Sequence, residues 1–205
     1  MTIAMGSNDQ KLPLVYLARH GETAWTISGQ HTGVTDLPLT ERGERNASRL
    51  GDRLHGLIFS HVFTSPLCRA MRTCELAGFG SVAVVNHDLV EWNYGLFEGM
   101  TTEQILQQWP GWELFRDGCP DGESVVEVTV RAKRVIQRLR ASDGNVLLFS
   151  SSHFLRVLAA CWLGWEPNAG QRLFLGTAAL SILGYNHGRN DPVIHLWNEC
   201  RHDGE

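Results

Sequence analysis

The sequence lacks the features of several protein classes. No apolar run approaches the roughly 20 residues that a membrane-spanning helix needs. The start has neither the basic residues nor the apolar core of a signal peptide, so we expect residues 1–12 to be a disordered tail or a cloning remnant, and 13–205 to form one domain. There are 18 Lys and Arg against 22 Asp and Glu, and the basic residues are scattered. This distribution argues against a nucleic-acid surface, so any cationic site must be local.

Paired cysteines and metal-ligand spacings are also missing. The five cysteines include no Cys-x-x-Cys pair, and no histidine lies at a spacing suited to zinc. We therefore expect reduced thiols, a cytoplasmic location, no metal and no cofactor. Surface or structural roles are predicted for seven of the nine histidines, which share no spacing: His31, His55, His61, His87, His187, His195 and His202.

The pattern that is present is an alternation of apolar runs of strand length with stretches of helical periodicity. Strands are predicted over 14–18, 58–64, 82–85, 145–150, 180–185 and 193–197. Helices are predicted after the N-caps Thr40 and Ser124, over 101–109 and 154–163, and from Pro66 with Ser65 as its cap. Both 82–85 and 145–150 are expected to be buried strands. The sequence therefore predicts an α/β three-layer sandwich with a mostly parallel sheet and helices on both faces.

Three motifs follow strand-length runs. The first run ends in Arg-His-Gly at 19–21, the second in Ser-Pro-Leu-Cys-Arg-Ala at 65–70, and the third precedes Glu-Trp-Asn-Tyr-Gly-Leu-Phe-Glu-Gly at 91–99. An Arg-His pair at a strand end is more often ordinary surface, but the C-terminal edge of such a sheet is where open α/β folds bind ligands. Cations and an imidazole at this edge favour phosphate chemistry, with histidine as nucleophile and arginine as phosphate ligand.

Together the motifs resemble the histidine phosphatase superfamily, the phosphoglycerate mutase-like proteins, from about Leu14 to Asn198. The resemblance implies a phosphohistidine at His20, with Arg19 and Arg69 in the phosphate pocket. It also implies that Glu91 is the acid/base, a role that suits a carboxyl group beside apolar side chains.

Three further residues match positions where the family contacts substrate. Thr32 and Gly33 match a loop whose backbone amides and hydroxyl touch the phosphate, and Thr26 stands where many members carry Asn or Ser. Glu98, in the third motif, is expected to lie in a turn that leads into the next helix.

One departure from the family lies after the fourth run. The family pattern is Ser-His-Gly with an arginine five residues after the histidine, whereas this chain has serine at both Ser151 and Ser152. Counting from the strand end and back from Arg156 both place the missing histidine at Ser151, and His153 is then an additional histidine that phosphatase-type members often carry. In the alternative register, an insertion lets His153 take the missing role. The family implies that Ser151 and His153 both face substrate.

The resemblance leaves three functions open. Mutases carry a long insertion with further arginines after the acid, whereas 101–122 is short and holds only Arg116, which favours hydrolysis. The motifs at 26–30, 91–95 and 116–119 are most similar to the subgroup of sedoheptulose bisphosphatases and mycobacterial acid phosphatases, and imply sugar phosphates as substrates. We therefore expect a phosphomonoesterase, with a phosphoglycerate mutase or a non-catalytic phosphate-binding protein as alternatives. The expected partner is a small phosphorylated molecule, with no nucleic acid or membrane and a possible homodimer.

Overall fold

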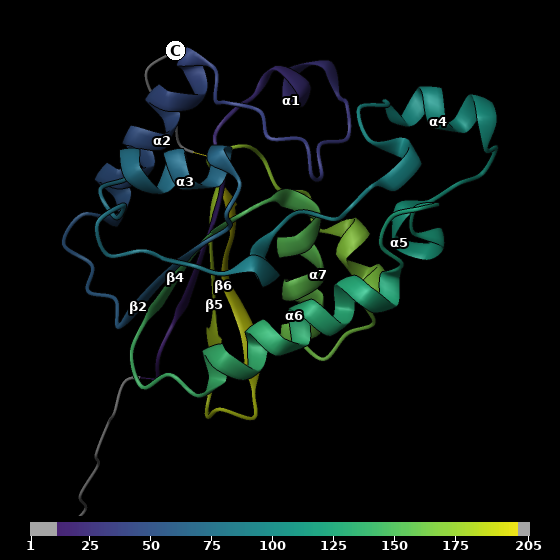
Figure 1. Ribbon diagram of the computed structural model, residues 1–205. Coiled ribbons are helices and arrows are strands. Elements are labelled where there is room, and N and C mark those ends of the chain that lie inside the picture. Colours follow the sequence, from purple (N-terminus) through teal and green to yellow (C-terminus); the bar gives the residue numbers. More distant parts are fainter. Residues whose placement is uncertain (1–11, 201–205) are drawn as a thin grey trace, which may run out of the picture.

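The computed structural model describes residues 12–200, which form a six-stranded sheet between two layers of helices (Figure 1). The strand order is β3-β2-β4-β1-β5-β6, in which β1 to β4 run parallel and β5 is antiparallel to both of its neighbours, β1 and β6. The sheet is thus mostly parallel, as predicted. The strands are β1 (Val15–Arg19), β2 (His61–Thr64), β3 (Val84–Val85), β4 (Val146–Ser150), β5 (Leu180–Tyr185) and β6 (Pro192–Glu199).

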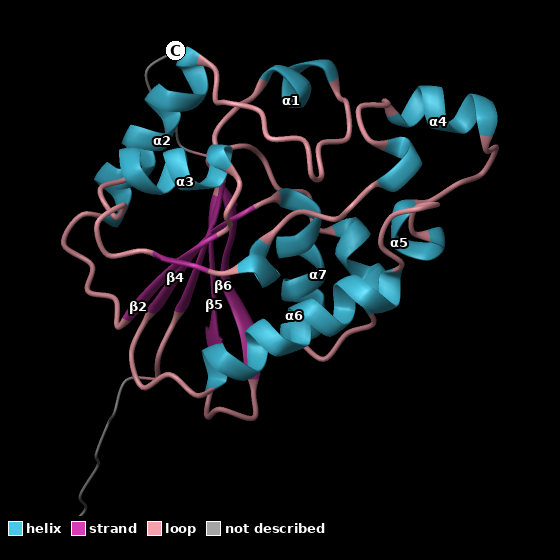
Figure 2. Ribbon diagram, in the orientation of Figure 1, coloured by secondary structure: helices cyan, strands magenta, loops and turns pink. Residues whose placement is uncertain are grey.

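Helices cover both faces of the sheet, as Figure 2 shows. One face packs against α2 and α3, the other against α6 and α7, and α4 and α5 project beside the second layer (Figure 2). The α-helices are α1 (Ala24–Ser28), α2 (Glu41–Leu54), α3 (Cys68–Leu76), α4 (Thr102–Gln108), α5 (Leu114–Asp117), α6 (Val125–Arg140) and α7 (Ser152–Trp162). Short 3₁₀-helices are η1 (His87–Leu89), η2 (Gly95–Phe97) and η3 (Pro167–Arg172).

Alternation along the central strands produces two separate cores. In β1, Tyr16 and Ala18 pack in the α2–α3 core, whereas Val15 and Leu17 pack in the core beneath α6 and α7. Every residue of β4 is buried. An apolar run without alternation is what a strand covered on both faces requires, and for β4 the prediction is confirmed.

Helix starts were predicted well where a side chain caps the helix locally. The hydroxyl of Thr40 accepts a hydrogen bond from the Gly43 amide at 3.0 Å, and Ser124 and Glu127 form a capping box at the start of α6. Thr101 forms another with Gln104 at the start of α4.

Two helix starts, the start of β2 and the predicted burial of β3 were wrong. Strand β2 begins at His61 instead of residue 58. Helix α3 begins at Cys68, not at Pro66, and Ser65 does not cap it, because the Ser65 hydroxyl accepts a hydrogen bond from the Leu67 amide in the preceding turn. Strand β3 is short and 58% exposed at Val84, because it lies at the sheet edge, a position that an apolar pattern does not reveal. Helix α7 starts at Ser152, two residues before the predicted Phe154.

The parallel strands bring three chain segments to one edge of the sheet. His20 follows β1, Ser65 follows β2 and Ser151 follows β4. The His20 amide donates to the Ser150 carbonyl at 2.9 Å, and the Ser65 amide donates to the Phe149 carbonyl at 2.9 Å. The backbone therefore fixes the relative positions of all three segments.

Among residues 12–200 no helix is long and apolar enough to cross a membrane. Most of the tail predicted over 1–12 lies outside the described residues.

Candidate active site

His20 is a buried histidine at the end of β1, only 3% exposed. Its Nδ1 lies 2.8 Å from the Gly21 carbonyl oxygen. A carbonyl can only accept, so Nδ1 carries the ring proton and Nε2 keeps its lone pair. Burial, together with the charges of Arg69 and Arg19, lowers the pKa of His20 well below 6.5. The imidazole is therefore neutral and suited to nucleophilic attack.

Arg69, on the first turn of α3, is fully buried and organises the loop over 32–35. Its Nη1 donates to the carbonyl of Thr35, and its Nη2 donates to those of Thr32 and Gly33. The carboxylate of Glu98 accepts from the amides of Gly33 and Thr35 at 2.9 and 3.0 Å. The Gly33 amide, expected to contact phosphate, is therefore occupied by Glu98. Glu98 is more than a turn residue, because it holds this loop.

Three buried polar atoms around His20 have no hydrogen-bond partner among the described residues. They are Nε of Arg19, Nε of Arg69 and Oγ of Ser151. Arg19 precedes His20, the charge of Arg69 acts on His20, and the residue before Ser151 accepts the His20 amide. Leaving a buried polar group unpaired costs about 1–3 kcal/mol. Three unpartnered donors, two of them cationic, suit an anion, and of these three residues Arg19 alone lines the cavity at His20.

The remaining predicted substrate contacts from the first half of the chain also hydrogen-bond to carbonyl oxygens of the protein. Arg19 Nη1 donates to the Leu175 carbonyl at 2.6 Å, which orients the guanidinium. The hydroxyl of Thr26 donates to the carbonyl of Thr23 at 2.8 Å in the capping box of α1, and that of Thr32 donates to the carbonyl of Gln30. Thr26 and Thr32 both line the cavity at His20.

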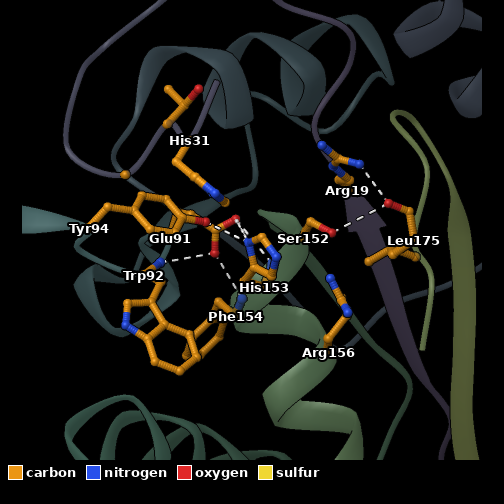
Figure 3. Close-up of polar contacts among 12 residues, drawn as sticks. Arg19, His31, Glu91, Trp92, Tyr94, Ser152, His153, Phe154, Arg156 and Leu175 are labelled. Atoms are coloured by element: carbon orange, nitrogen blue, oxygen red, sulfur yellow. Dashed lines mark hydrogen bonds and ion pairs between the residues drawn. The ribbon is translucent and has the colours of Figure 1, made fainter. Parts of the chain in front are cut away.

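Glu91 is 5% exposed and lies against the N-terminus of α7 (Figure 3). Its Oε1 accepts from the amides of Trp92 and Phe154 at 2.9 and 2.8 Å, and its Oε2 accepts from that of His153 at 3.0 Å. These bonds satisfy free amides of the first turn. A cap from a distant segment explains why α7 starts earlier than its own sequence predicts.

His153 lies in the site, in contact with Tyr94 and near Glu91, and not on the surface. Its Nδ1 is 2.5 Å from the Tyr94 hydroxyl and 3.9 Å from Oε2 of Glu91 (Figure 3). Burial, together with the charges of Arg156, His31 and Arg19, lowers the pKa of His153 well below 6.5. Ser151, by contrast, is fully buried at the N-cap position of α7.

Sequence reasoning missed several residues of the site, three of which have titratable side chains. His31, expected to be a surface or structural histidine, packs its ring 4.7 Å from that of Tyr94 and lines the cavity. Arg156, used only to set the register, lines it too, and so does Tyr94. The only available signal was proximity in sequence, because His31 precedes Thr32 and Tyr94 lies within the third motif.

The cavity at His20 has a volume of about 210 Å³. A larger hollow of about 550 Å³ lies beside α4 and α5, but none of its lining residues belongs to the predicted site. The smaller cavity is lined by His20, Glu91 and His153, whereas Arg69 and Ser151 are not among its lining residues. Its lining residues are Arg19, His20, Trp25, Thr26, Gly29, Gln30, His31, Thr32, Glu91, Tyr94, Ser152, His153, Arg156, Phe174 and Leu175.

The described residues contain no group of three or more His, Cys, Asp or Glu side chains arranged to hold a metal ion. All five cysteines lie in this part of the chain and are free.

Comparisons with known proteins agree with this geometry. The model of the histidine phosphatase superfamily (branch 1) matches residues 15–200. An acid phosphatase from Mycobacterium tuberculosis is 38% identical over 188 residues, which cover 90% of this chain and 91% of the relative. Sedoheptulose 1,7-bisphosphatase from Saccharomyces cerevisiae is 36% identical, over 74% of this chain and 68% of the relative.

A solved structure of an open-reading-frame product from M. tuberculosis superimposes with a TM-score of 0.87 at 36% identity, over 93% of this chain and 99% of that chain. Sequence and fold agree over nearly the whole described chain, and the resemblance drawn from the three motifs is confirmed: the chain belongs to the histidine phosphatase superfamily.

Proposed function

We propose that this chain hydrolyses phosphomonoesters of small metabolites, with sugar phosphates as the expected class, through a phosphohistidine at His20. The observation that carries the proposal is the group of three unpartnered buried donors around a neutral buried imidazole. Three equatorial oxygens of a transferring phosphoryl group would give the Arg19, Arg69 and Ser151 donors their missing acceptors.

The reaction has two displacements. Nε2 of His20 attacks phosphorus while the bond to the ester oxygen breaks, and Glu91 gives its proton to the departing alkoxide. Glu91 then takes a proton from a water molecule that attacks the phosphohistidine. The N–P bond breaks, inorganic phosphate leaves, and His20 returns with its lone pair. Atoms and protons balance over the cycle without a cofactor.

Ser151 is expected to lower the rate of phosphoryl transfer. Its hydroxyl supplies one neutral hydrogen bond where the family pattern has an imidazole that stabilises charge on the phosphoryl group. Losing one preorganised donor typically costs about a hundred- to thousandfold in rate. We therefore propose a slow phosphatase.

Hydrolysis is favoured over phosphoryl transfer to a second substrate because the segment over 101–122 adds no residue to the lining of the cavity at His20. Its one arginine, Arg116, donates instead to Asp117 and to the Gly111 carbonyl. A mutase must retain its phosphorylated intermediate, and no cation from this segment is placed to do so. A homodimer and a cytoplasmic location stay predictions.

The direct test is to trap the intermediate. The protein is incubated briefly with phosphoramidate, and its intact mass is measured at neutral pH and after acid treatment. We expect one acid-labile phosphate adduct in the wild type and in His195→Ala, a matched control at an exposed histidine of β6, and none in His20→Ala. An adduct of equal yield in His20→Ala would overturn the proposal.

A turnover assay separates the three functions. Release of inorganic phosphate from a panel of sugar phosphates and bisphosphates supports hydrolysis. Conversion of 3-phosphoglycerate to 2-phosphoglycerate without phosphate release would identify a mutase. Binding of inorganic phosphate or vanadate with neither adduct nor turnover would identify a binding protein.

A further inference from the structure

His153 lies on the acid side of the cavity, the side formed by Glu91, Tyr94, His31 and His153. Its ring is 5.5 Å from that of Phe115 and 6.0 Å from that of His31, and its backbone amide binds Glu91. In Figure 3 the ring lies between the Glu91–Tyr94 pair and Arg156. The charges that act on His153 are those of Arg156, His31 and Arg19, and the ring lines the same cavity as His20 and Glu91. Because Glu91 is the proposed proton donor to the departing alkoxide, its contact with His153 places the ring near the alcohol part of a substrate.

The contact with Tyr94 fixes the position of the ring proton. Tyr94 has a single hydroxyl proton, and its hydroxyl has no other hydrogen bond among the described residues. Burial raises the pKa of this phenol well above 10, so it remains protonated. If Nδ1 carried the imidazole proton, the phenol proton would have to turn away from Nδ1, which lies 2.5 Å from the hydroxyl oxygen, and would then have no partner. The arrangement that pairs both groups has the Tyr94 hydroxyl donating to Nδ1, so the proton is on Nε2.

The Nε2–H group is left available to a ligand. The His153 side chain is 21% exposed and lines the cavity, while its Nδ1 edge is occupied by Tyr94. The ring is also uncharged, so it offers a directional donor rather than a cation. Such a donor suits a neutral oxygen of the substrate and discriminates against an analogue that lacks this oxygen.

We propose that Tyr94 is a positioning residue that holds His153 as its Nε2–H tautomer, and that His153 determines specificity by donating this hydrogen to an oxygen beside the phosphoester. The expected ligand class is a phosphomonoester of a polyol. This inference rests on the proposed function for the orientation of the ester, but the tautomer can be tested without turnover.

The tautomer is measured by nitrogen-15 NMR of histidine-labelled full-length protein at pH 7, with His153→Gln to assign the signals. We expect the wild type to show His153 as the neutral Nε2–H form. In Tyr94→Phe, which removes only the hydroxyl, we expect a mixture of tautomers. A neutral Nδ1–H form or an imidazolium in the wild type would overturn the inference, as would an unchanged tautomer in a folded Tyr94→Phe.

Specificity is measured with a matched pair of esters, glycerol 3-phosphate and n-propyl phosphate, which differ in two hydroxyl groups. We expect His153→Phe to lower kcat/KM about tenfold or more for glycerol 3-phosphate, mainly through KM, and less than threefold for propyl phosphate. His153→Gln keeps an N–H donor on a side chain of similar reach and should recover part of the loss. Equal losses on both esters would overturn the specificity role and favour a role at the phosphoryl group.

Binding to His20→Asn separates failure of this inference from failure of the proposed function. The dissociation constants of both esters are measured with this variant, which lacks the nucleophile, and with the same variant carrying His153→Phe. We expect glycerol 3-phosphate to bind more tightly than propyl phosphate only when His153 is present. Equal affinities in both proteins would overturn the inference even if the wild type proves to be a phosphatase.

Discussion

The two sides of the candidate active site are built in different ways. The phosphate side, formed by Arg19, His20, Arg69 and Ser151, lies at the ends of β1 and β4 and on the first turn of α3. Backbone pairing of Arg19 with Ser150 fixes most of it. The acid side instead comes from loops and the start of α7, and side chains hold it together. Backbone pairing between strands therefore positions the residues of the phosphate side, whereas side-chain hydrogen bonds position those of the acid side.

The two sides also differ in charge. On the phosphate side, Arg19 and Arg69 donate to carbonyl oxygens and to no carboxylate among residues 12–200, so their charge stays available to an anion. The acid side places Glu91 beside two neutral groups, Tyr94 and His153. Variants that affect one side and leave the other intact can test this division.

The largest expected effect is on the acid side. Glu91→Gln removes the proton donor and should lower turnover of alkyl phosphates about 10²- to 10⁴-fold. The loss should be much smaller for p-nitrophenyl phosphate, whose leaving group needs little protonation. Initial rates on the two substrates measure the difference, and similar losses on both would contradict the acid role.

Glu98→Gln is the matched control for this substitution. Both glutamates accept amide hydrogens, Glu91 at the start of α7 and Glu98 in the loop over 32–35, so both variants lose an acceptor and both need a thermal melt. Glu98 does not line the cavity at His20. We expect Glu98→Gln to affect both substrates by a similar factor.

The difference between the two sides explains what the sequence could predict. Residues at strand ends follow from motifs because an apolar run and its register place them, as for His20 after β1. His31 was missed because its place depends on ring packing against Tyr94 from another loop. The sequence also did not reveal that the Gly33 amide is already hydrogen-bonded, because its acceptor, Glu98, lies 65 residues away. The start of α7 was displaced by Glu91, a contact that no local pattern reveals.

On the phosphate side, Arg69→Ala should weaken vanadate and inorganic phosphate binding about a hundredfold or more. It removes a charged donor and leaves three loop carbonyls without their partner. Arg69→Lys should recover little, because an ammonium cannot bridge the carbonyls and also face the anion. Calorimetric titration measures the affinities.

Arg72→Ala is the matched control on the same helix, because Arg72 is exposed and pairs with Glu44 and Glu75. It should change the affinity less than twofold. A comparable loss in Arg72→Ala would mean that general charge, rather than the placed guanidinium, holds the anion.

A smaller effect, and a gain, is expected where the family pattern is broken. Ser151→His with Ser152→Gly should raise turnover of p-nitrophenyl phosphate about 10- to 1000-fold, since an imidazole would join the phosphate side. On this substrate, which has no hydroxyl beside the ester, His153→Ala should change little. The opposite pair of results, with His153→Ala inactive and the double variant impaired, would show that His153 had taken the missing role.

The smallest effect compares the two neutral histidines through the pH dependence of stability. The pKa values of His20 and His153 are lowered in the folded protein, whereas both rise to about 6.5 on unfolding. Below pH 6.5 the unfolded chain binds protons that the folded protein does not. As the pH decreases below this value, each histidine should lower the free energy of unfolding by up to about 1.4 kcal/mol per pH unit. Above pH 6.5 neither group contributes.

Urea unfolding between pH 5 and 8 therefore tests one side of the cavity at a time. Below pH 6.5, the acid limb of the stability curve, the slope of the free energy of unfolding against pH should decrease in His20→Asn by the equivalent of about one proton. His153→Gln should decrease it by the same amount, because burial is the largest cause of both pKa shifts. Surface carboxylates titrate in all three proteins and cancel in the comparison. Inorganic phosphate should flatten the wild-type limb as well, since an anion beside His20 favours the imidazolium, and should do so far less in His20→Asn. An acid limb that is identical in the wild type and in His20→Asn would mean that the phosphate side does not hold its histidine neutral.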